Sequence, residues 1–445
     1  MKVRLKHRHH LEEKPHLTKS LGLLDMTMYG IGIIVGAGIY ALIGEGAGLA
    51  GNAIWLSFII GAFVAAFTGL SYCELNSMMP KDAAEYNYAK KAFNRKVGFV
   101  VGWMILVSSI VAASTVSLGF AGYFQAVFGQ YGALAVALCA IAVFSVINFY
   151  GMKESSEFNI VATLIEVGGL VAVIAIGFMF FNPSTDMMML TPSGMNGVMA
   201  GAVLMFFAFI GFESIANMSE EAKNPRRTVH KALLISLGIS TLLYILVAFS
   251  AANVLGWETL SSSKAPLSLL LERAFGPLAG MLMSFIALFS TGNTILISLI
   301  VASRILYGMA RDGSIPSLFS KVYARTSTPY VAVIASMVAA MLFLFIGDIS
   351  FIANVTTVSI LVAYAMVNLS LIVLRYKHPK DERPFKVPLN IGRFPVLAAI
   401  GLVTSLCMVL IADITIVLVD VALIALGFVI YTLYRKAVPE EKAHS

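Results

Sequence analysis

The stretch Gly30-Ile-Gly-Ile-Ile-Val-Gly-Ala-Gly-Ile-Tyr40 lies in the middle of the first long apolar segment and places four glycines there. In hydrocarbon, an unpaired backbone N–H or C=O costs several kcal/mol, so a spanning helix is interrupted only where it faces protein or a water-filled cavity. The amides freed after such a break suit an anion, and the carbonyls freed before it suit a cation or an ammonium group. The stretch therefore predicts a broken helix and a binding site for a zwitterion.

Gly32 and Gly36 also admit a simpler interpretation. Glycines four residues apart often let two membrane helices pack closely. The glycine pattern alone is more typical of this packing seam than of a break, so other parts of the chain must decide between the two.

The composition indicates a membrane protein. Of its 445 residues, 59% are hydrophobic and only 12% are charged, which leaves too little polar surface for a soluble globule. A spanning helix needs about 20 apolar residues. The sequence predicts an all-α polytopic protein with twelve transmembrane helices, at residues 24–49, 53–79, 98–127, 132–150, 157–181, 197–217, 230–254, 277–309, 329–347, 351–374, 394–411 and 414–434.

The basic residues predict the orientation of these spans. Of the 31 Lys and Arg residues, all but Lys264 and Arg273 fall in the two tails or in every second loop. By the positive-inside rule, the N-terminal tail 1–20 and the C-terminal tail 435–445 are cytoplasmic, as in a multi-pass protein of the cell membrane. The net charge of +7 is then a topology signal, and no nucleic-acid partner is expected.

A second irregular segment follows five spans after the first. Residues 206–217 read Phe-Phe-Ala-Phe-Ile-Gly-Phe-Glu-Ser-Ile-Ala-Asn and place Gly211 and Glu213 deep in an apolar run. Interruptions at corresponding places point to internal repeats, and a repeat of five spans reverses its orientation in the membrane. The sequence predicts a 5+5 inverted repeat, with spans 1–5 in residues 21–182, spans 6–10 in 196–376 and two added spans in 393–434.

Two loops are expected to contain helical segments. Pro80–Lys96 has apolar residues at helical spacing, which predicts a short amphipathic helix. The outer loop Gly256–Gly276 contains a short apolar run and is expected to lie in the membrane interface.

Ionisable side chains inside spans are expensive to bury, so each is a candidate functional group. Glu166 lies in the middle of span five, and Glu213 follows the second irregular segment. A carboxyl removed from water is what proton coupling requires, so both are predicted to take part in ion coupling. The alternatives are a protonated Glu166 that serves architecture only and a Glu213 that only stabilises the dipole of its own helix.

Small polar residues form two patches within spans. Ser290, Asn293 and Thr294 in span eight are candidates for ion coupling. Ser114 and Thr115 in span three are candidates for substrate binding. Such side chains also bridge neighbouring helices, at about 0.6 kcal/mol each, and this is the alternative for both patches.

The sequence lacks the features of a membrane enzyme or an ATP-driven pump. Its histidines fall in tails and loops, away from mid-membrane positions where a metal, haem or quinone site would need them. There is no Walker A motif, and the three cysteines form no metal-binding pattern. We predict no enzyme activity, no cofactor and no metal, with transport driven by an ion gradient or by exchange.

Four loop motifs resemble those of the amino acid, polyamine and organocation superfamily, in particular cationic and general amino acid permeases. They are Glu220-Glu-Ala-Lys-Asn-Pro-Arg-Arg227, Ala310-Arg-Asp-Gly-Ser-Ile-Pro316, Arg383-Pro-Phe-Lys-Val-Pro388, and Glu74 to Pro80 followed by Tyr86 and Tyr88. They extend over nearly the whole chain and are far more specific than the glycine pattern. They therefore favour the broken helix over the packing seam.

The resemblance implies the inverted-repeat fold of the bacterial leucine transporter, with a central site between broken spans one and six. By position, the amides that would bind a substrate carboxylate are those of Gly36, Ala37 and Gly38. The carbonyls that would bind its ammonium group are those of Ile34, Phe207 and Ile210. The Phe207 side chain also matches the aromatic residue that gates the site in relatives.

Two of the departures from the family pattern concern the expected binding site and ion coupling. Ala37 replaces the Ser or Thr that is frequent between the two glycines, so binding there rests on backbone groups alone. Glu166 falls where proton-coupled relatives have a lysine, so the sign of the charge is inverted.

We therefore predict a secondary active amino acid transporter that works by alternating access as a proton-coupled symporter. Because the expected pocket offers apolar and hydroxyl groups but no cation, a small or apolar neutral substrate is favoured over an acidic one, with a basic substrate bound through Glu213 as the alternative. The alternatives are exchange of an amino acid for its amine product and coupling to sodium. A channel or a membrane enzyme subunit is disfavoured by the pair of broken helices and the missing cofactor ligands.

Overall fold

The computed structural model describes most of the chain. The described residues are 21–80, 84–129, 131–150, 156–217, 219, 222–323, 325–326, 328–346 and 348–437. The predicted N-terminal tail lies outside them, as do Glu220, Glu221 and residues 438–445 of the predicted C-terminal tail.

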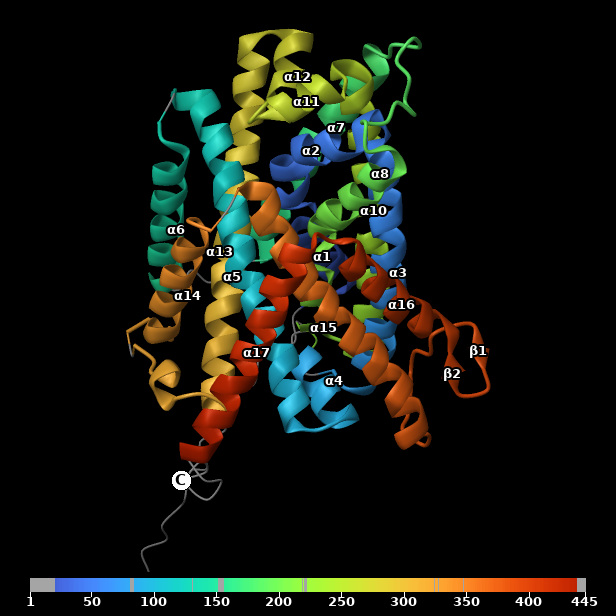
Figure 1. Cartoon of the computed structure of the whole chain (residues 1–445), viewed down its shortest axis with the longest axis vertical. Coiled ribbons are helices and arrows are strands. Elements are labelled where there is room, and N and C mark those ends of the chain that lie inside the picture. The colour runs from blue at the N-terminus through green and yellow to red at the C-terminus, as the bar shows by residue number, and fades with distance from the viewer. Residues whose placement is uncertain are drawn as a thin grey trace, which may run out of the picture.

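Helices make up nearly all of the described chain (Figure 1). The first half forms α1 (Leu23–Val35), α2 (Ala37–Ala50), the 3-10 turn η1 (Gly51–Ala53), α3 (Ile54–Met78), α4 (Ala84–Ala92), α5 (Arg95–Phe128), α6 (Ala133–Tyr150) and α7 (Ser156–Met179). The second half forms α8 (Gly194–Met205), η2 (Phe206–Phe209), α9 (Phe212–Asn217), α10 (Pro225–Leu255), α11 (Trp257–Ser262), α12 (Pro266–Phe275), α13 (Pro277–Arg311), η4 (Ser317–Ser320), α14 (Tyr330–Phe343) and α15 (Ile349–Lys377). Two further helices follow, α16 (Val396–Ile411) and α17 (Ile414–Ala437).

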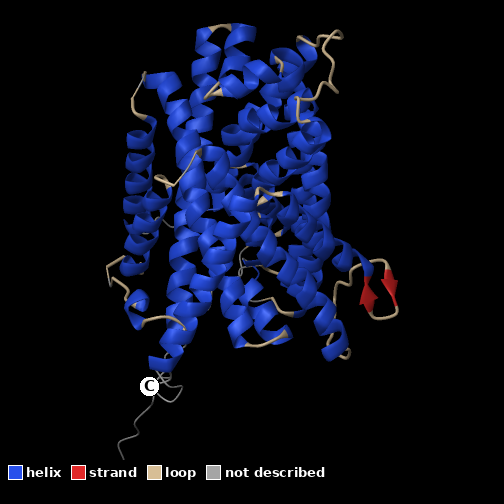
Figure 2. Cartoon of the chain, viewed as in Figure 1, coloured by secondary structure: helices blue, strands red, loops and turns tan. Residues whose placement is uncertain are grey.

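A two-stranded antiparallel hairpin lies between α15 and α16 (Figure 2). Strand β1 (Asn390–Ile391) pairs with β2 (Phe394–Pro395). The turn between them is Gly392-Arg393, and Gly392 has a φ of 61°, in the left-handed region that glycine enters without strain. The hairpin projects from the side of the helix bundle (Figure 1).

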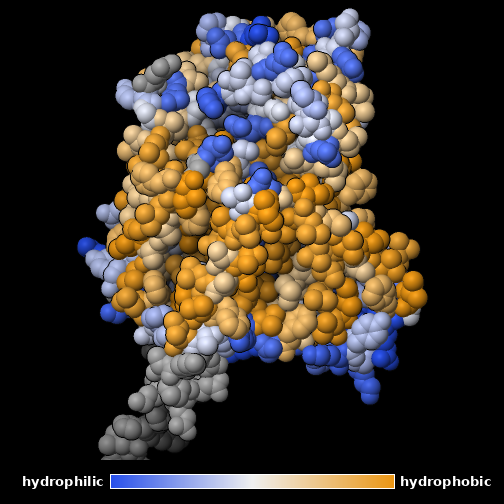
Figure 3. Space-filling view, in the orientation of Figure 1, coloured by the Kyte–Doolittle hydropathy of each residue, from blue (hydrophilic) through white to orange (hydrophobic). Residues whose placement is uncertain are grey.

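The apolar helices confirm an all-α polytopic membrane protein. Among the described residues, eight helical stretches are long and apolar enough to cross a membrane, and the first, Leu23–Met78, contains two predicted spans. Three shorter apolar helices lie in predicted spans five, nine and eleven: Thr163–Met179, Tyr330–Phe343 and Val396–Ile411. Apolar side chains cover the middle of the surface and polar ones gather toward its two ends (Figure 3), as a bilayer requires.

The most extensive helix contacts join the two halves of the chain. Helix α5 packs along α13, α3 packs along α10, and α2 packs against α8. Each pair combines predicted spans that are five apart in the sequence. The interrupted segments lie inside the bundle, because α1 packs on α7 and α10 while η2 packs on α3 and α15.

The loop helices are part of the packed fold. Helix α4 confirms the short helix predicted within Pro80–Lys96, and it packs on α5 and α15. The outer loop forms α11 and α12, which pack on α2 and α13 and bury Leu260, Leu267 and Leu270. These two helices therefore cover the ends of spanning helices. Their position in the membrane interface stays a prediction.

Candidate functional site

The first predicted break lies at Gly36. Helix α1 ends at Val35 and α2 begins at Ala37, with Gly36 at a φ of −46° and a ψ of −152° between them. The Ala37 amide donates a hydrogen bond to Thr294 Oγ1 of α13 at 3.0 Å. A Cβ on Gly36 would lie 2.5 Å from that oxygen, so only glycine allows the approach. The freed amide is thus held by a side chain from predicted span eight.

The second interruption is longer. It comprises the turn η2, the extended residue Ile210 and Gly211, after which α9 begins. The Ile210 amide donates to the Phe207 carbonyl at 3.2 Å, and the Gly211 amide donates to Glu213 Oε2 at 2.9 Å. Gly211 has a φ of 119°, which L side chains rarely adopt. This segment satisfies its freed amides largely from within.

The two interruptions are in direct contact. A Cβ on Gly38 would lie 2.5 Å from the Cα of Ala208, and one on Gly211 would lie 2.4 Å from Cγ2 of Ile33. Glycine is therefore required on both sides of the contact. This arrangement brings together the predicted backbone groups of Gly36, Ala37, Gly38, Ile34, Phe207 and Ile210.

Tyr244 of α10 links the two interruptions and was missed by the sequence analysis. Its hydroxyl contacts the Ile34 carbonyl and lies 2.8 Å from the Ala208 carbonyl. Because a hydroxyl has one proton, it donates to one carbonyl at a time. The signal in the sequence is a lone tyrosine deep in an apolar span, since a buried Tyr hydroxyl usually needs a partner.

Glu166 lies beside the first interruption and is fully buried. Neither of its carboxylate oxygens has a hydrogen-bond partner among the described residues. Ser290 and Asn293 of α13 face the carboxylate, and the Ser290 hydroxyl is also without a partner in this part of the chain. The structure therefore brings together three of the predicted ion-coupling residues, and Thr294 connects them to the break.

Helix α7 holds Glu166 against both halves of the interrupted helix. The Thr163 hydroxyl, one turn earlier, donates to the Met28 carbonyl of α1 at 3.3 Å. The Tyr40 hydroxyl of α2 donates to the backbone carbonyl of Glu166 at 2.8 Å. A movement between α1 and α2 therefore changes the surroundings of the Glu166 carboxylate.

Glu213 is tied to the second interruption. Besides the Gly211 amide, its Oε2 accepts a hydrogen bond from the Tyr364 hydroxyl of α15 at 2.5 Å. Tyr364 packs in an aromatic cluster with Tyr72, Phe206 and Phe212. Glu213 thus lies in the first turn of α9, and its carboxylate is bound by groups other than those that surround Glu166.

The remaining predicted site residues have other contacts. Phe207 is 5% exposed and Ile210 is half-buried, both in the second interruption. The Ser114 hydroxyl donates to the Ala340 carbonyl of α14 at 2.7 Å, and the Thr115 hydroxyl donates to its own helix at Val111, 3.1 Å away. The structure does not bring Ser114 to the interruptions, so a substrate contact by Ser114 or Thr115 stays a prediction.

Comparison with known proteins decides the family. Residues 21–433 match the family model described as amino acid permease. The chain belongs to the amino acid permease family. It is similar to the branched-chain amino acid permease of Bacillus subtilis, with 31% identity over 94% of each chain. The methylthioribose transporter of that organism is 28% identical over 94% of each chain. Cationic amino acid transporter 3, mitochondrial, of Arabidopsis thaliana is 31% identical over 85% of this chain and 65% of its own.

Family membership confirms a multi-pass membrane transporter that is not an enzyme. It also confirms the resemblance drawn from the four loop motifs. The permease brings these motifs together at the end of the bundle where its basic loops gather.

A buried carboxylate joins two of the motifs. Glu74 is fully buried, and its carboxylate accepts a hydrogen bond from Arg375 Nε at 2.8 Å. Arg375 Nη2 binds its other oxygen, Arg383 Nε lies 3.1 Å from Oε1, and the Val387 amide donates to Oε2 at 2.8 Å. This Glu74 clamp fixes α3 to α15 and to the segment before α16.

The other motifs also make contacts between distant parts of the chain. The Tyr86 hydroxyl of α4 donates to Asp312 Oδ2 at 2.5 Å, and Arg95 Nη2 lies 3.2 Å from the same oxygen. Burial and the bond to Asp312 raise the pKa of Tyr86, so the hydroxyl keeps its proton and remains a donor. The Lys223 amide donates to the Leu21 carbonyl at 3.0 Å, which ties the first motif to the start of α1.

Asp420 is a further buried acid that the sequence analysis overlooked. Asp420 of α17 is 2% exposed, and its Oδ1 accepts a hydrogen bond from the Ser359 hydroxyl of α15 at 2.5 Å. An aspartate in the middle of span twelve was the available signal. It lies at the contact of α15 with α17, away from the interruptions.

Proposed function

We propose that this permease is a secondary active amino acid transporter that works by alternating access as a proton-coupled symporter. The observation that carries the proposal is the direct contact between two interrupted helices whose freed backbone groups suit a zwitterion. Because the segments are packed against each other, a substrate binds only when they separate. That separation is the movement on which alternating access depends.

The proposed architecture is twelve spans in a 5+5 inverted repeat. Counting α1–α2 and α3 as two spans, and the three shorter apolar helices as further spans, accounts for all twelve. The pairing of helices five spans apart supports the repeat. So do α4 and the pair α11–α12, which follow spans two and seven at opposite ends of the bundle (Figure 1). The repeats would comprise residues 21–182 and 196–376, with 393–434 added.

The proposed orientation places both termini in the cytoplasm and the protein in the cell membrane. It rests on the basic residues of every second loop. The motif contacts at that end of the bundle then belong to the cytoplasmic side.

Glu166 is the proposed coupling residue. A buried carboxylate whose oxygens make no hydrogen bond to the described residues is costly unless it is neutralised by a proton or a cation. Glu166 lies on α7, beside α13 and both halves of the broken helix. Binding of a proton or cation in one state of the transporter and its release in another would therefore bias the movement of α1 against α2. Glu213, already bound by Gly211 and Tyr364, would take a secondary part at the second interruption.

Two observations support alternatives to proton coupling. The Glu166 carboxylate, the Ser290 hydroxyl and the Asn293 side chain together offer the oxygen ligands that a hard cation such as sodium prefers. The similarity to a cationic amino acid transporter supports exchange of one amino acid or amine for another as the second alternative.

The proposed substrate is a small or apolar neutral amino acid. The branched-chain relative matches 94% of the chain, and the side chains at the interruptions, among them Ile34, Phe207 and Ile210, are apolar. Phe207 is the proposed gate, since it is buried beside the contact of the two segments. A thermal-shift screen of amino acids on the purified protein tests this choice, because a ligand at 100 times its dissociation constant stabilises by about 2.7 kcal/mol.

Gly38→Val tests the site itself. Its side chain would collide with the backbone of Ala208, so we expect substrate counterflow in proteoliposomes to be abolished while the protein remains expressed. The matched control is Gly238→Val on the exposed face of α10, where no atom lies within 4 Å of the added Cβ. Normal counterflow by Gly38→Val would remove the site from the first interruption.

A further inference from the structure

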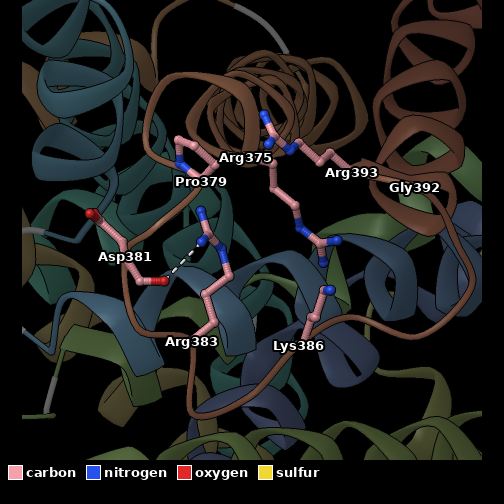
Figure 4. Close-up of a pocket in the computed structure, with 7 residues that line it drawn as sticks. All are labelled: Arg375, Pro379, Asp381, Arg383, Lys386, Gly392 and Arg393. Atoms are coloured by element: carbon pink, nitrogen blue, oxygen red, sulfur yellow. Dashed lines mark hydrogen bonds between the residues drawn. The ribbon is translucent and has the colours of Figure 1, made fainter.

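A pocket rich in cations lies where α15 and α16 reach the end of the bundle. Its volume is about 250 Å³, and it lies between the end of α15 and the β1–β2 hairpin. Four lining side chains are cationic: Arg375, Arg383, Lys386 and Arg393 (Figure 4). One lining side chain, Asp381, is acidic.

The charges at the back of this pocket are balanced within the protein. Arg375 and Arg383 bind Glu74, and their side chains are only 3% and 9% exposed. The Asp381 carboxylate is bound to Lys91 at 2.7 Å. The back of the pocket is therefore held in place, and its acid is already paired.

The unbalanced charge belongs to Lys386 and Arg393 at the rim. Both are exposed, and neither has an ion pair within the part of the chain that the structure describes. In Figure 4 the Lys386 amine points toward the Arg375 guanidinium, and Arg393 extends from the turn of the hairpin across the backbone end of the Arg375 side chain. Like charges that converge repel each other, and an anion between them removes that repulsion.

Apolar residues adjoin this rim. Leu389 is 67% exposed and Ile391 is 75% exposed, directly before the turn that holds Arg393. Leu389 has a φ of 56°, the one positive φ of a non-glycine residue in the described chain, a conformation that costs on the order of 1–3 kcal/mol. The apolar spans α15 and α16 end and begin on either side of the hairpin, so these residues lie at the level of the membrane interface.

We propose that this pocket binds the phosphate of an anionic phospholipid headgroup, with Lys386 and Arg393 as its ligands. Basic pockets between the ends of spans suit such headgroups. Guanidinium and ammonium groups form strong charge-assisted hydrogen bonds with phosphate oxygens. The exposed Leu389 and Ile391 favour a lipid over a soluble phosphate, because they contact the acyl boundary beside the headgroup. The site is separate from the transport site and does not depend on the proposed coupling.

The test is native mass spectrometry of the full chain in neutral detergent, titrated with phosphatidylglycerol and, separately, with phosphatidylcholine. The test variant combines Lys386→Gln with Arg393→Gln. The matched control combines Lys321→Gln with Arg325→Gln, one exposed Lys and one exposed Arg in another loop of the same end. Because a basic residue near an anionic lipid contributes about 1 kcal/mol, we expect phosphatidylglycerol to bind about 25-fold more weakly to the test variant and unchanged to the control.

Three results would overturn the proposal. The first is native affinity of the test variant for phosphatidylglycerol, and the second is an equal loss in the control, which would indicate general charge attraction. The third is a thermal shift with millimolar inorganic phosphate that needs Lys386 and Arg393 when phosphatidylglycerol produces none, which would make the ligand a soluble anion. All four substituted side chains are exposed, so the variants are expected to fold.

Discussion

Two fully buried carboxylates in this permease have opposite surroundings. Glu74 at the basic end of the bundle is bound by Arg375, by Arg383 and by a backbone amide. Glu166 in the middle of α7 has no hydrogen-bond partner for either carboxylate oxygen among the described residues. Burial alone therefore does not distinguish a structural acid from a candidate functional one. The hydrogen-bond and ion-pair partners of the carboxylate make that distinction.

The difference has a physical cause. A buried ion pair stabilises a fold only when hydrogen bonds satisfy the remaining groups, and removing one partner leaves an uncompensated charge. Glu74 meets that condition, so its expected role is structural. Glu166 does not meet that condition in this structure, which is why we propose it as the coupling residue.

Glu74→Gln should cost the most. It leaves Arg375 and Arg383 buried without their counter-charge, and breaking such a pair costs about 3–5 kcal/mol. Melting in detergent measures the loss. Glu382→Gln, in an exposed pair with Arg226, is the matched control and should change stability by about 1 kcal/mol or less. Equal losses in the two variants would contradict the structural role assigned to Glu74.

Tyr364→Phe should have an intermediate effect. It removes one of the donors to Glu213 and leaves a buried carboxylate less satisfied, at a cost of about 1–3 kcal/mol. The same melting assay measures it, with Tyr376→Phe on the exposed surface of α15 as control. A melting temperature equal to that of the native protein would show that the Gly211 amide alone satisfies Glu213.

Asp381→Asn should have a small effect that depends on pH. The hydrogen bond from Lys91 lowers the pKa of Asp381, so its stabilisation is complete above the ordinary pKa of an aspartate and is lost as the pH falls through the lowered value. An exposed pair contributes about 1 kcal/mol or less. The difference in melting temperature from the native protein should therefore be small at pH 7 and should shrink further as the pH falls below the ordinary pKa of an aspartate, about 3.9. A difference that grows with acidity would contradict this assignment.

Glu166→Gln should cost little stability, because it removes a buried charge and keeps a side chain of the same shape beside Ser290 and Asn293. It should also mimic the protonated form, so substrate counterflow persists while uphill uptake driven by a pH gradient is lost. If sodium is the coupling ion, native uptake requires sodium and the variant loses that requirement. A variant that still concentrates substrate with native pH dependence would leave Glu166 a structural residue.

The sequence predicted both helix interruptions close to where they occur. The glycines at 36 and 38 and the Gly211–Glu213 segment stand out because apolar spans contain few such residues. The sequence also indicated Glu166 and its neighbours in α13, Ser290 and Asn293, as candidate coupling residues, since polar groups are rare in spans. It did not reveal Tyr244, because one tyrosine in a span indicates a hydrogen bond without indicating the partner. Ser114 shows the converse. The sequence predicted it as a substrate ligand, but its hydroxyl donates a hydrogen bond to the Ala340 carbonyl.

The sequence by itself determined that the chain is a polytopic helical membrane protein, because composition and apolar segment length are local properties. It also located the interruptions and the four loop motifs, for which local residue order is sufficient. Only the tertiary structure decided which groups meet across the chain. Glu74 and Arg375 are 301 residues apart, and Ala37 and Thr294 are 257 residues apart. Such contacts arise when distant helices pack together, so the sequence placed Glu166 inside a span and only the fold separated the compensated carboxylate of Glu74 from the uncompensated one of Glu166.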